Sequence, residues 1–104
     1  MKRALQRFEG FDAWISPTTA IYPPPVESLA NPQTAFDLAL GMTRNTQPAN
    51  YLDLCAVSIP LPMDGHGLPA GLQVMCPPGE EERLLGIALA IEMLMGQPQL
   101  PSVQ

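Results

Sequence analysis

Ser58 is the residue whose type best suits it to act as a nucleophile. It lies in the apolar run 55–59, and a serine hydroxyl attacks a carbonyl group when a nearby base takes its proton. The run lacks the G-x-S-x-G turn that presents a serine at the end of a strand. The single lysine, Lys2, is next to the N-terminus, where it is not expected to be buried beside a serine. We therefore expect Ser58 to be a hydrogen-bonded residue of a packed sheet, and we expect no catalytic residue in this chain.

The other candidates for acid–base or metal chemistry are one histidine and one group of carboxylates. His66 lies in a loop rich in Gly and Pro, with no partner nearby in the sequence, so we expect an imidazole in contact with solvent. Glu80, Glu81 and Glu82 form the first turn of the longest predicted helix, where the positive end of the helix dipole favours negative charge without a cation. His, Cys and carboxylate residues do not show the spacing of metal ligands. We expect neither a metal site nor a cofactor.

Four polar residues are candidates for binding a small molecule: Thr18, Thr46, Gln47 and Asn50. Thr18 follows a predicted strand, and the other three lie where a short helix begins. Loops at the ends of strands in α/β folds line binding clefts, so these side chains are placed where a ligand would bind. The alternative is that these side chains only form the hydrogen bonds of helix caps and turns, which use the same residue types at the same places. That alternative stays open.

Three predicted strands position these residues. Residues 55–59 and 70–76 form near-continuous apolar runs, which are typical of strands covered on both faces, and residues 11–16 form a third strand. Residues two apart in a strand share a face, so Leu72 and Val74 should both be buried. Helices are predicted at 1–9, 31–42, 50–54 and 80–95. The pattern predicts an α/β fold with part of a mixed β-sheet of about three strands, flanked by helices.

The composition describes one small domain with much apolar surface to cover. Hydrophobic residues make up 46% of the 104 residues and charged residues 14%, against roughly 25% charged residues in typical domains. The net charge of −5 argues against nucleic acid and membrane surfaces as partners. No run of 18 apolar residues occurs, so no membrane span is expected. Cys55 and Cys76 are expected to be free and buried, and we expect a cytoplasmic protein.

Two motifs in the middle of the chain carry a resemblance. Asn-x5-Ala-x-Ser-x-Pro begins at Asn50, and Gly-Leu-Pro-Ala-Gly-Leu-Gln covers residues 67–73. With Pro17-Thr18 before them and the helical residues 82–92 after them, they resemble the C-terminal portion of the amidase signature family over about the whole chain. Thr46 and Asn50 match the residues that precede the first central strand in that family. The variant Asn-x-Leu-Asp-Leu is similar to allophanate-hydrolase-like amidases, and the subfamily stays open.

The resemblance implies an enzyme that hydrolyses a small-molecule carboxamide through an acyl-enzyme on a serine, activated through a second serine and a lysine. The Gly/Ser-rich segment that carries the nucleophile in the family has no match here, so the triad is expected upstream of residue 1. Residues 1–104 are then a single domain, the C-terminal fragment of an amidase fold, which supplies sheet strands and a wall of the substrate cleft. Alone, we expect the chain to be inactive and to form a homo-oligomer through uncovered apolar surface. The alternatives are a standalone amidase-derived fold used for binding or assembly, and a proline-mediated interaction module.

Overall fold

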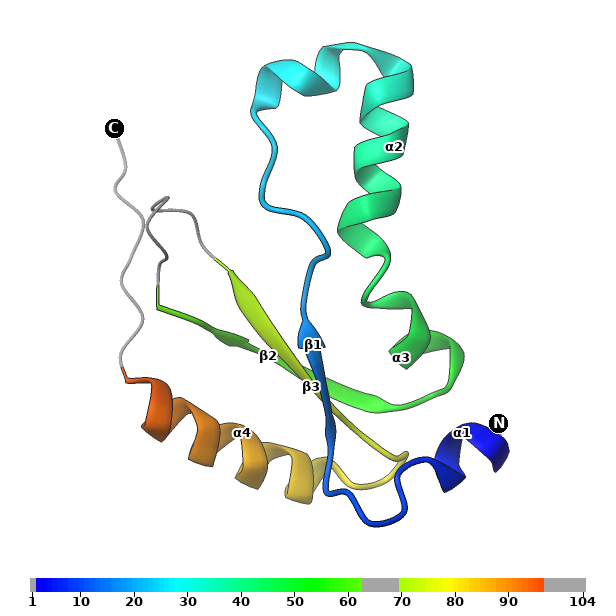
Figure 1. Cartoon of the computed structure of the whole chain (residues 1–104), viewed down its shortest axis with the longest axis vertical. Coiled ribbons are helices and arrows are strands. Elements are labelled where there is room, and N and C mark those ends of the chain that lie inside the picture. The colour runs from blue at the N-terminus through cyan, green and yellow to red at the C-terminus, as the bar shows by residue number, and fades with distance from the viewer. Residues whose placement is uncertain (1, 63–69, 97–104) are drawn as a thin grey trace.

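The computed structural model describes residues 2–62 and 70–96, so His66 and residues 67–69 of the glycine-rich motif lie outside the described part. The elements in chain order are α1 (Lys2–Gln6), β1 (Trp14–Pro17), the 3-10 helix η1 (Val26–Ala30), α2 (Pro32–Thr43), α3 (Gln47–Tyr51), β2 (Cys55–Pro60), β3 (Gly71–Cys76) and α4 (Glu81–Met95). α4 lies along one face of the sheet, whereas η1 and α2 project away from it (Figure 1). We call η1 and α2 together the arm.

The three strands form one sheet in the order β1–β3–β2, with β3 in the middle. Both pairings are antiparallel, and the register places Ser16 and Ser58 on either side of Gln73. The expected α/β fold with three strands flanked by helices is confirmed. A mixed sheet also requires a parallel pairing, and both pairings among the described strands are antiparallel.

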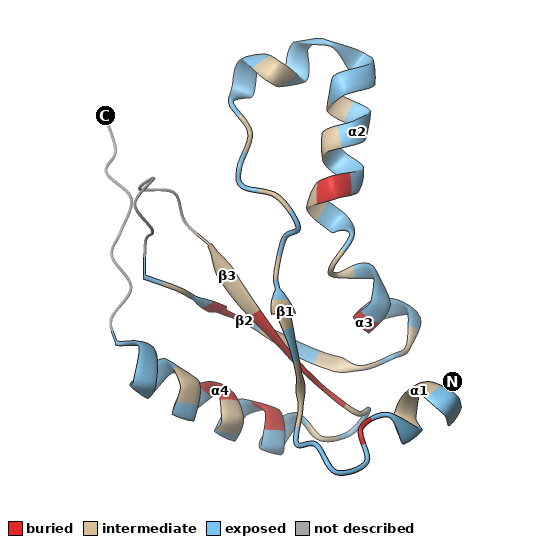
Figure 2. Ribbon diagram, viewed as in Figure 1, coloured by how far each residue is buried: buried red, intermediate tan, exposed pale blue. Residues whose placement is uncertain are grey.

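The central strand is buried on both faces, whereas β2 is buried on one. The four consecutive residues 73–76 of β3 are all buried. Along β2, buried or half-buried residues alternate with the exposed residues Ala56, Ser58 and Pro60 (Figure 2). The prediction that both apolar runs are covered on both faces is right for most of β3 and wrong for β2. The reason is that β2 is an edge strand with α4 on one of its faces.

α4 covers the sheet face on which Val74 lies. The buried core of this face consists of Ile59, Val74, Cys76, Leu84 and Ala88. Val74 is fully buried, as predicted, but Leu72 on the same face is only half-buried. The prediction for Leu72 is wrong because this residue lies beside an open pocket at the end of the sheet.

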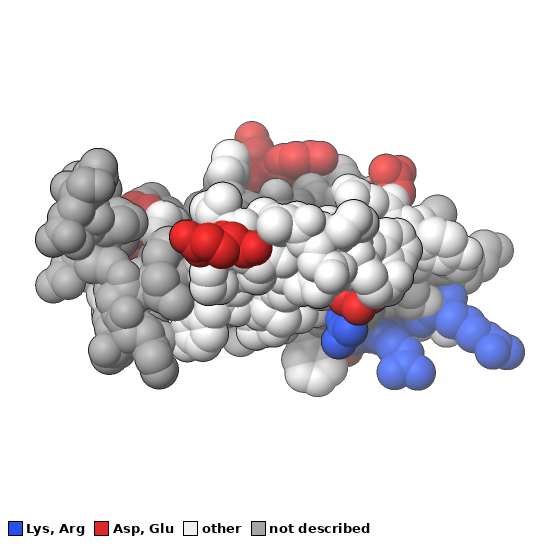
Figure 3. Space-filling model, turned by 90° about the horizontal axis from the view of Figure 1, so that it is seen from above, with Lys and Arg blue, Asp and Glu red and all other residues white. Residues whose placement is uncertain are grey.

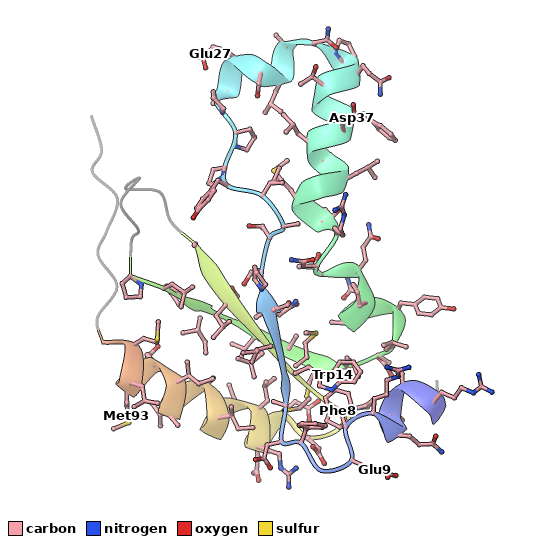
Figure 4. The ribbon with its side chains drawn as sticks, in the orientation of Figure 1. Phe8, Glu9, Trp14, Glu27, Asp37 and Met93 are labelled. Carbon is pink, nitrogen blue, oxygen red and sulfur yellow. The ribbon has the colours of Figure 1, made fainter. Side chains whose placement is uncertain are left out.

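α1 is joined to the sheet through an aromatic contact. Phe8 is buried and stacks on Trp14, with ring centroids 3.9 Å apart (Figure 4). The helix predicted at 1–9 ends at Gln6, and the strand predicted at 11–16 begins only at Trp14. Both are shorter than predicted because the backbone N–H groups of residues 7–9 and 11 bond to carbonyls three residues earlier, which makes successive turns.

The arm is built from local interactions. α2 begins after Asn31, whose side-chain oxygen accepts hydrogen bonds from the backbone N–H groups of Gln33 and Thr34. The helix predicted at 31–42 is therefore confirmed with a shift of one residue at each end. Gly41 is the one buried residue of α2, while its large apolar residues Phe36 and Leu40 are exposed.

α3 lies between the arm and β2. It spans Gln47–Tyr51, with Thr46 as its N-cap and Pro48 in its first turn, as the sequence Thr46-Gln47-Pro48 indicates. The helical residues predicted at 50–54 are displaced by three residues, because the helix already begins after this cap. Asp53 has a positive φ of 58°, a conformation that ends the helix and that Asp tolerates better than most residues. Over the described ranges, no helix combines the length and apolar character needed to cross a bilayer.

Candidate binding site at the end of the sheet

The hydroxyl groups of Thr18 and Ser58 meet above Gly71 at one end of the central strand. Thr18 Oγ1 and Ser58 Oγ are 2.6 Å apart, although their segments lie on opposite sides of β3. A Cβ atom at residue 71 would lie 2.7 Å from the serine oxygen and 2.8 Å from the threonine oxygen. Glycine is therefore required at this position for the two outer segments to bond across the middle strand. Ser58 is a hydrogen-bonded sheet residue, as predicted, but it lies on the exposed face of β2.

Gln73 anchors a second set of hydrogen bonds two residues further along β3. Its side chain is buried, and Nε2 donates to Ser16 Oγ at 3.1 Å and to the carbonyl oxygen of Asn45 at 2.8 Å. The Asn45 side chain in turn donates through Nδ2 to the carbonyl oxygen of Pro17 at 2.9 Å. A buried amide is costly unless it is hydrogen-bonded, so these contacts account for its burial. They hold the corner between α2 and α3 against the end of β1.

A pocket of about 570 Å³ opens at the same end of the sheet, and neither Thr18 nor Ser58 lines it. Its walls come from the end of β1, from residues 19–22, and from the adjoining ends of β2 and β3. Ile15, Leu61 and Leu72 contribute apolar surface, Ser16 and Thr19 contribute hydroxyl groups, and none of the lining residues is charged. A pocket of this kind suits an apolar group of a small molecule that also carries an uncharged polar group.

Thr18 lies between the pocket residues Pro17 and Thr19 in the chain, but it does not itself line the pocket, because its hydroxyl group bonds Ser58. Thr46, Gln47 and Asn50 lie at and within α3 instead. Thr46 Oγ1 donates to the carbonyl oxygen of Thr43 at 3.0 Å, and Gln47 Nε2 donates to Thr43 Oγ1 at 3.3 Å. Local contacts of this kind are expected if Thr46 and Gln47 stabilise a turn and a helix cap, which is the alternative to ligand binding. Within the described part of the chain, no hydrogen bond joins Thr18 to these three residues.

The two cysteines face each other across β2 and β3, and both are free thiols. Cys76 is fully buried, as predicted, whereas Cys55 is half-buried. Burial raises the pKa of the Cys76 thiol above its ordinary value, and the neighbouring Cys55 raises it further. A raised pKa keeps the thiol protonated at neutral pH, so Cys76 serves as a core residue and not as a nucleophile.

Acidic and basic side chains are unevenly distributed on the surface, although Arg83 and Glu80 form an ion pair at 3.8 Å. Figure 3 shows Arg side chains gathered toward the end of the molecule that carries α1, while most of the Asp and Glu side chains visible on this face lie elsewhere. In residues 2–62 and 70–96, no group of three or more His, Cys, Asp or Glu side chains could hold a metal ion. The polar side chains that line the pocket, Ser16, Thr19 and Tyr22, all carry hydroxyl groups.

Sequence reasoning missed three members of the site. Ser16, Asn45 and Gln73 form the second set of hydrogen bonds, and none of them was expected to bind anything. Gln73 carried a usable signal, because a single amide inside an apolar strand must find a buried partner. Asn45 carried no such signal, since its contacts depend on how the corner between α2 and α3 meets the sheet.

Comparison with known proteins decides the family. The model of the Amidase family matches residues 1–85. The chain belongs to the amidase family. The family membership that its central motifs indicate is thus confirmed, and the subfamily is not resolved.

Several amidase relatives resemble the chain over most of its length. It is 37% identical to 2-amino-5-chloromuconic acid deaminase from Comamonas testosteroni, over 90% of this chain and 20% of that protein. It is 34% identical to fatty acid amide hydrolase from Arabidopsis thaliana, over 99% of this chain and 17% of that protein. The crystal structure of a glutamyl-tRNA(Gln) amidotransferase subunit from Thermotoga maritima superimposes with a TM-score of 0.76 at 29% identity, over 99% of this chain and 22% of that one. The chain therefore spans about a fifth of the length of these relatives.

Proposed function

We propose that residues 1–104 form the strands and one wall of the substrate cleft in an amidase that hydrolyses a small-molecule carboxamide. The observation that carries the proposal is the position of the pocket. It opens at the end of the sheet where Thr18 and Ser58 are hydrogen-bonded, and the chain superimposes on the structure of an amidotransferase subunit. The relatives named above act on amides and related C–N bonds according to their names, which supports the same reaction class here.

We propose that the serine nucleophile, the second serine and the lysine of this chemistry come from outside residues 1–104. The support is in the side chains at the site. Ser58 is hydrogen-bonded to Thr18, and the described residues around the pocket provide no basic side chain to take its proton. The chain taken alone is then inactive.

The four predicted binding residues have different places in this proposal. Thr18 contacts the substrate from the rim of the pocket, next to Pro17 and Thr19. Thr46, Gln47 and Asn50 contact it from α3, which the Gln73–Asn45 hydrogen bond holds against the sheet. The pocket itself takes the apolar part of the amide, and its hydroxyl groups bond the polar part.

Two measurements on the purified chain test the proposal. A panel of simple carboxamides should show no turnover, and turnover that disappears in Ser58→Ala would contradict the external triad. In an NMR titration with phenylacetamide, amide shifts should change at Thr19 and Gly71, which line the pocket, and not in the arm. Ala70→Phe should fill the pocket and abolish these changes. Ala90→Phe, on the exposed side of α4, is the matched control and should leave them intact.

We also propose that the chain forms a homo-oligomer and works in the cytoplasm. Exposed apolar side chains support self-association, since large apolar patches are usually covered by a partner. On α4 alone these residues are Leu85, Leu89, Met93, Leu94 and Met95. Light scattering at micromolar concentration should therefore give a mass above that of one chain, and a lone monomer would contradict this part of the proposal.

A further inference from the structure

Cys55 and Cys76 lie directly opposite each other where β2 begins and β3 ends. The backbone N–H of Leu61 bonds to the carbonyl oxygen of Ala70 at 3.0 Å, and this pair extends the register in which Cys55 faces Cys76. Hydrogen-bonded and non-hydrogen-bonded pairs alternate along an antiparallel ladder, so counting back by twos makes the cysteines a hydrogen-bonded pair. The Cα atoms of such a pair are about 5.5 Å apart, which is a common Cα separation in disulfides.

Both side chains lie on the sheet face that α4 covers, because directly opposed residues of a ladder share a face. Cys76 belongs to the buried core of that face, and the half-buried Cys55 packs against it. Opposed Cβ atoms are about 4.5–5.5 Å apart, whereas a disulfide needs about 3.5–4.5 Å. The strands would therefore have to approach by about 1 Å. The cysteines form the last pair of the ladder, so only one side of the pairing resists this movement.

Each thiol donates to a backbone carbonyl in this structure. Cys55 Sγ lies 3.3 Å from the carbonyl oxygen of Pro77, and Cys76 Sγ lies 3.5 Å from that of Asp12. Cys55 Sγ is also 3.6 Å from the carbonyl oxygen of Cys76. The pKa of the Cys76 thiol is raised by burial and then by Cys55, which agrees with two thiols that are close neighbours. Thiols are weak donors, so rotation of both side chains about their Cα–Cβ bonds can break these contacts and bring the sulfur atoms together.

We propose that Cys55 and Cys76 form a redox modification site, at which a peroxide converts the two thiols into a reversible cross-strand disulfide. Cys55 reacts first, because it is partly exposed and Cys76 is fully buried. Cys76 is not reactive toward reagents in solution, but its sulfur attacks Cys55 once that neighbour has been oxidised. Both residues belong to one pair of adjacent strands, so the site is complete within this chain, whatever covers the outer edges of the sheet.

The reaction has two steps and consumes one molecule of hydrogen peroxide. The Cys55 sulfur attacks one peroxide oxygen and the O–O bond breaks, which leaves a sulfenic acid on Cys55 and one water that carries away the thiol proton. The Cys76 sulfur then attacks the sulfenic sulfur, the S–O bond breaks, and the hydroxyl group leaves with the Cys76 proton as a second water. The two sulfurs together lose two electrons, and the peroxide gains them.

Disulfide formation changes contacts in two neighbouring segments. The carbonyl oxygen of Asp12, just before β1, and that of Pro77, between β3 and α4, lose their thiol donors. The oxidation state of the pair is thereby linked to the attachment of both segments to the sheet. The modification is reversible, because strained or partly exposed disulfides are the ones that thiols such as glutathione reduce most readily.

Mass spectrometry of the purified chain after treatment with one equivalent of hydrogen peroxide tests the pairing. The chain should lose the mass of two hydrogen atoms, run as a single chain on a non-reducing gel, and regain the lost mass with dithiothreitol. Cleavage before Asp64, which lies between the cysteines in the sequence, should give fragments that stay joined until they are reduced. A covalent dimer, a chain that only gains oxygen atoms, or a chain that keeps both thiols would overturn the proposal.

A double variant tests the register. Cys55→Ala with Ala56→Cys moves the thiol by one residue, to the exposed face of β2, which Cys76 does not share. The number of residues between the two cysteines hardly changes, yet the yield of intramolecular disulfide should fall about tenfold. An unchanged yield would mean that nearness in the sequence alone makes the bond, and would overturn the proposal.

Single variants test which thiol reacts first. Cys76→Ala should accumulate a sulfenic acid on Cys55, which dimedone labels. Cys55→Ala should lose its remaining thiol about tenfold more slowly than the wild type, because Cys76 is buried. Loss at the wild-type rate, or no dimedone label on Cys55, would overturn the proposal. If an alanine variant does not fold by circular dichroism, Cys55→Ser or Cys76→Ser keeps a donor for the same carbonyl and replaces it in the test. None of these results bears on carboxamide turnover.

Discussion

The unit formed by β2, β3 and α4 and the arm formed by η1 and α2 both contain apolar residues but use them differently. In the first, the apolar residues of two strands and one helix meet in a shared core around Val74 and Leu84. In the arm, Phe36 and Leu40 are exposed and only Gly41 is buried. Burial of apolar surface is the main source of stability, so the arm has little tertiary stabilisation of its own.

The difference teaches that apolar content does not by itself make a core. The strands of the first unit are placed by a ladder whose register brings every second residue to the same face. The arm meets the rest of the chain through few contacts. Ile21 packs against Gly41, and the hydrogen bond from Gln73 to Asn45 fixes the corner at the end of α2. We therefore expect the arm to open without the sheet unfolding.

The sharpest test compares one leucine in each region. Leu84→Ala should lower the free energy of unfolding by about 3 kcal/mol, because Leu84 is buried under the sheet and its loss leaves a cavity. Leu40→Ala in the arm removes a side chain that is 48% exposed, and should change the free energy by less than about 0.5 kcal/mol. Urea melts followed by circular dichroism measure both. Equal losses would mean that the arm shares the core.

A second test compares two glycines. Gly71→Ala should cost about 1–3 kcal/mol, since its Cβ would collide with the Thr18 and Ser58 hydroxyls. Removing both hydroxyls, as Thr18→Ala and Ser58→Ala, should recover part of the loss. In the arm, an added Cβ at Gly41 meets Ile21 at 3.4 Å, which is close to ordinary contact. Gly41→Ala should therefore be neutral, or stabilising by up to about 1 kcal/mol through helix propensity. If Gly41→Ala lowered the free energy of unfolding by a large amount, the arm would be packed as tightly as the sheet, and the difference between the two regions would be contradicted.

A third test acts on the arm alone. Asn31→Ala removes the two hydrogen bonds that cap α2 and should cost about 1 kcal/mol of local helix stability. Hydrogen exchange of α2 amides should quicken, while exchange in β3 stays unchanged. Asn50→Ala in α3, whose side chain is exposed, serves as the control and should affect neither. If hydrogen exchange in β3 quickened as much as in α2, the two regions would unfold as one cooperative unit, and the prediction would be wrong.

The smallest expected effect belongs to the core and depends on pH. The pKa of the Cys76 thiol is raised in the folded protein, so the unfolded chain loses its thiol proton first as pH rises. The buried, protonated Cys76 thiol contributes fully to the free energy of unfolding below pH 9.0, the ordinary pKa of a thiol. This contribution is lost as the pH rises from there through the raised pKa of the folded protein. The free energy of unfolding, measured in urea melts at pH 8 and pH 10, should change less between these pH values for Cys76→Ala than for the wild type. Identical pH dependence in the two proteins would contradict the role of burial.

Much of the fold could be predicted from the sequence because its strands and long helices carry strong local patterns. The β3 run ends at Pro77, and α4 begins with acidic residues, and both elements lie where those signals put them. The exposed face of β2 could not be predicted, because a continuous apolar run does not reveal which strand is at the edge. The site was only partly predictable. Thr18 could be predicted because it follows the end of a strand. Asn45 could not, because it reaches the end of β1 only through the turn between α2 and α3, and the hydrogen bond from Gln73 positions that turn.

The strand order has a consequence for the chain as it leaves the ribosome. β1 is made first, yet its one partner among the described strands is β3, and Trp14 pairs with Met75 near the other end of the chain. β2 and β3 are neighbours in sequence as well as in the sheet, so their hairpin closes the shorter loop and is expected to nucleate first. During synthesis, β1 must wait unpaired until β3 has emerged, which makes this strand a natural target for chaperones.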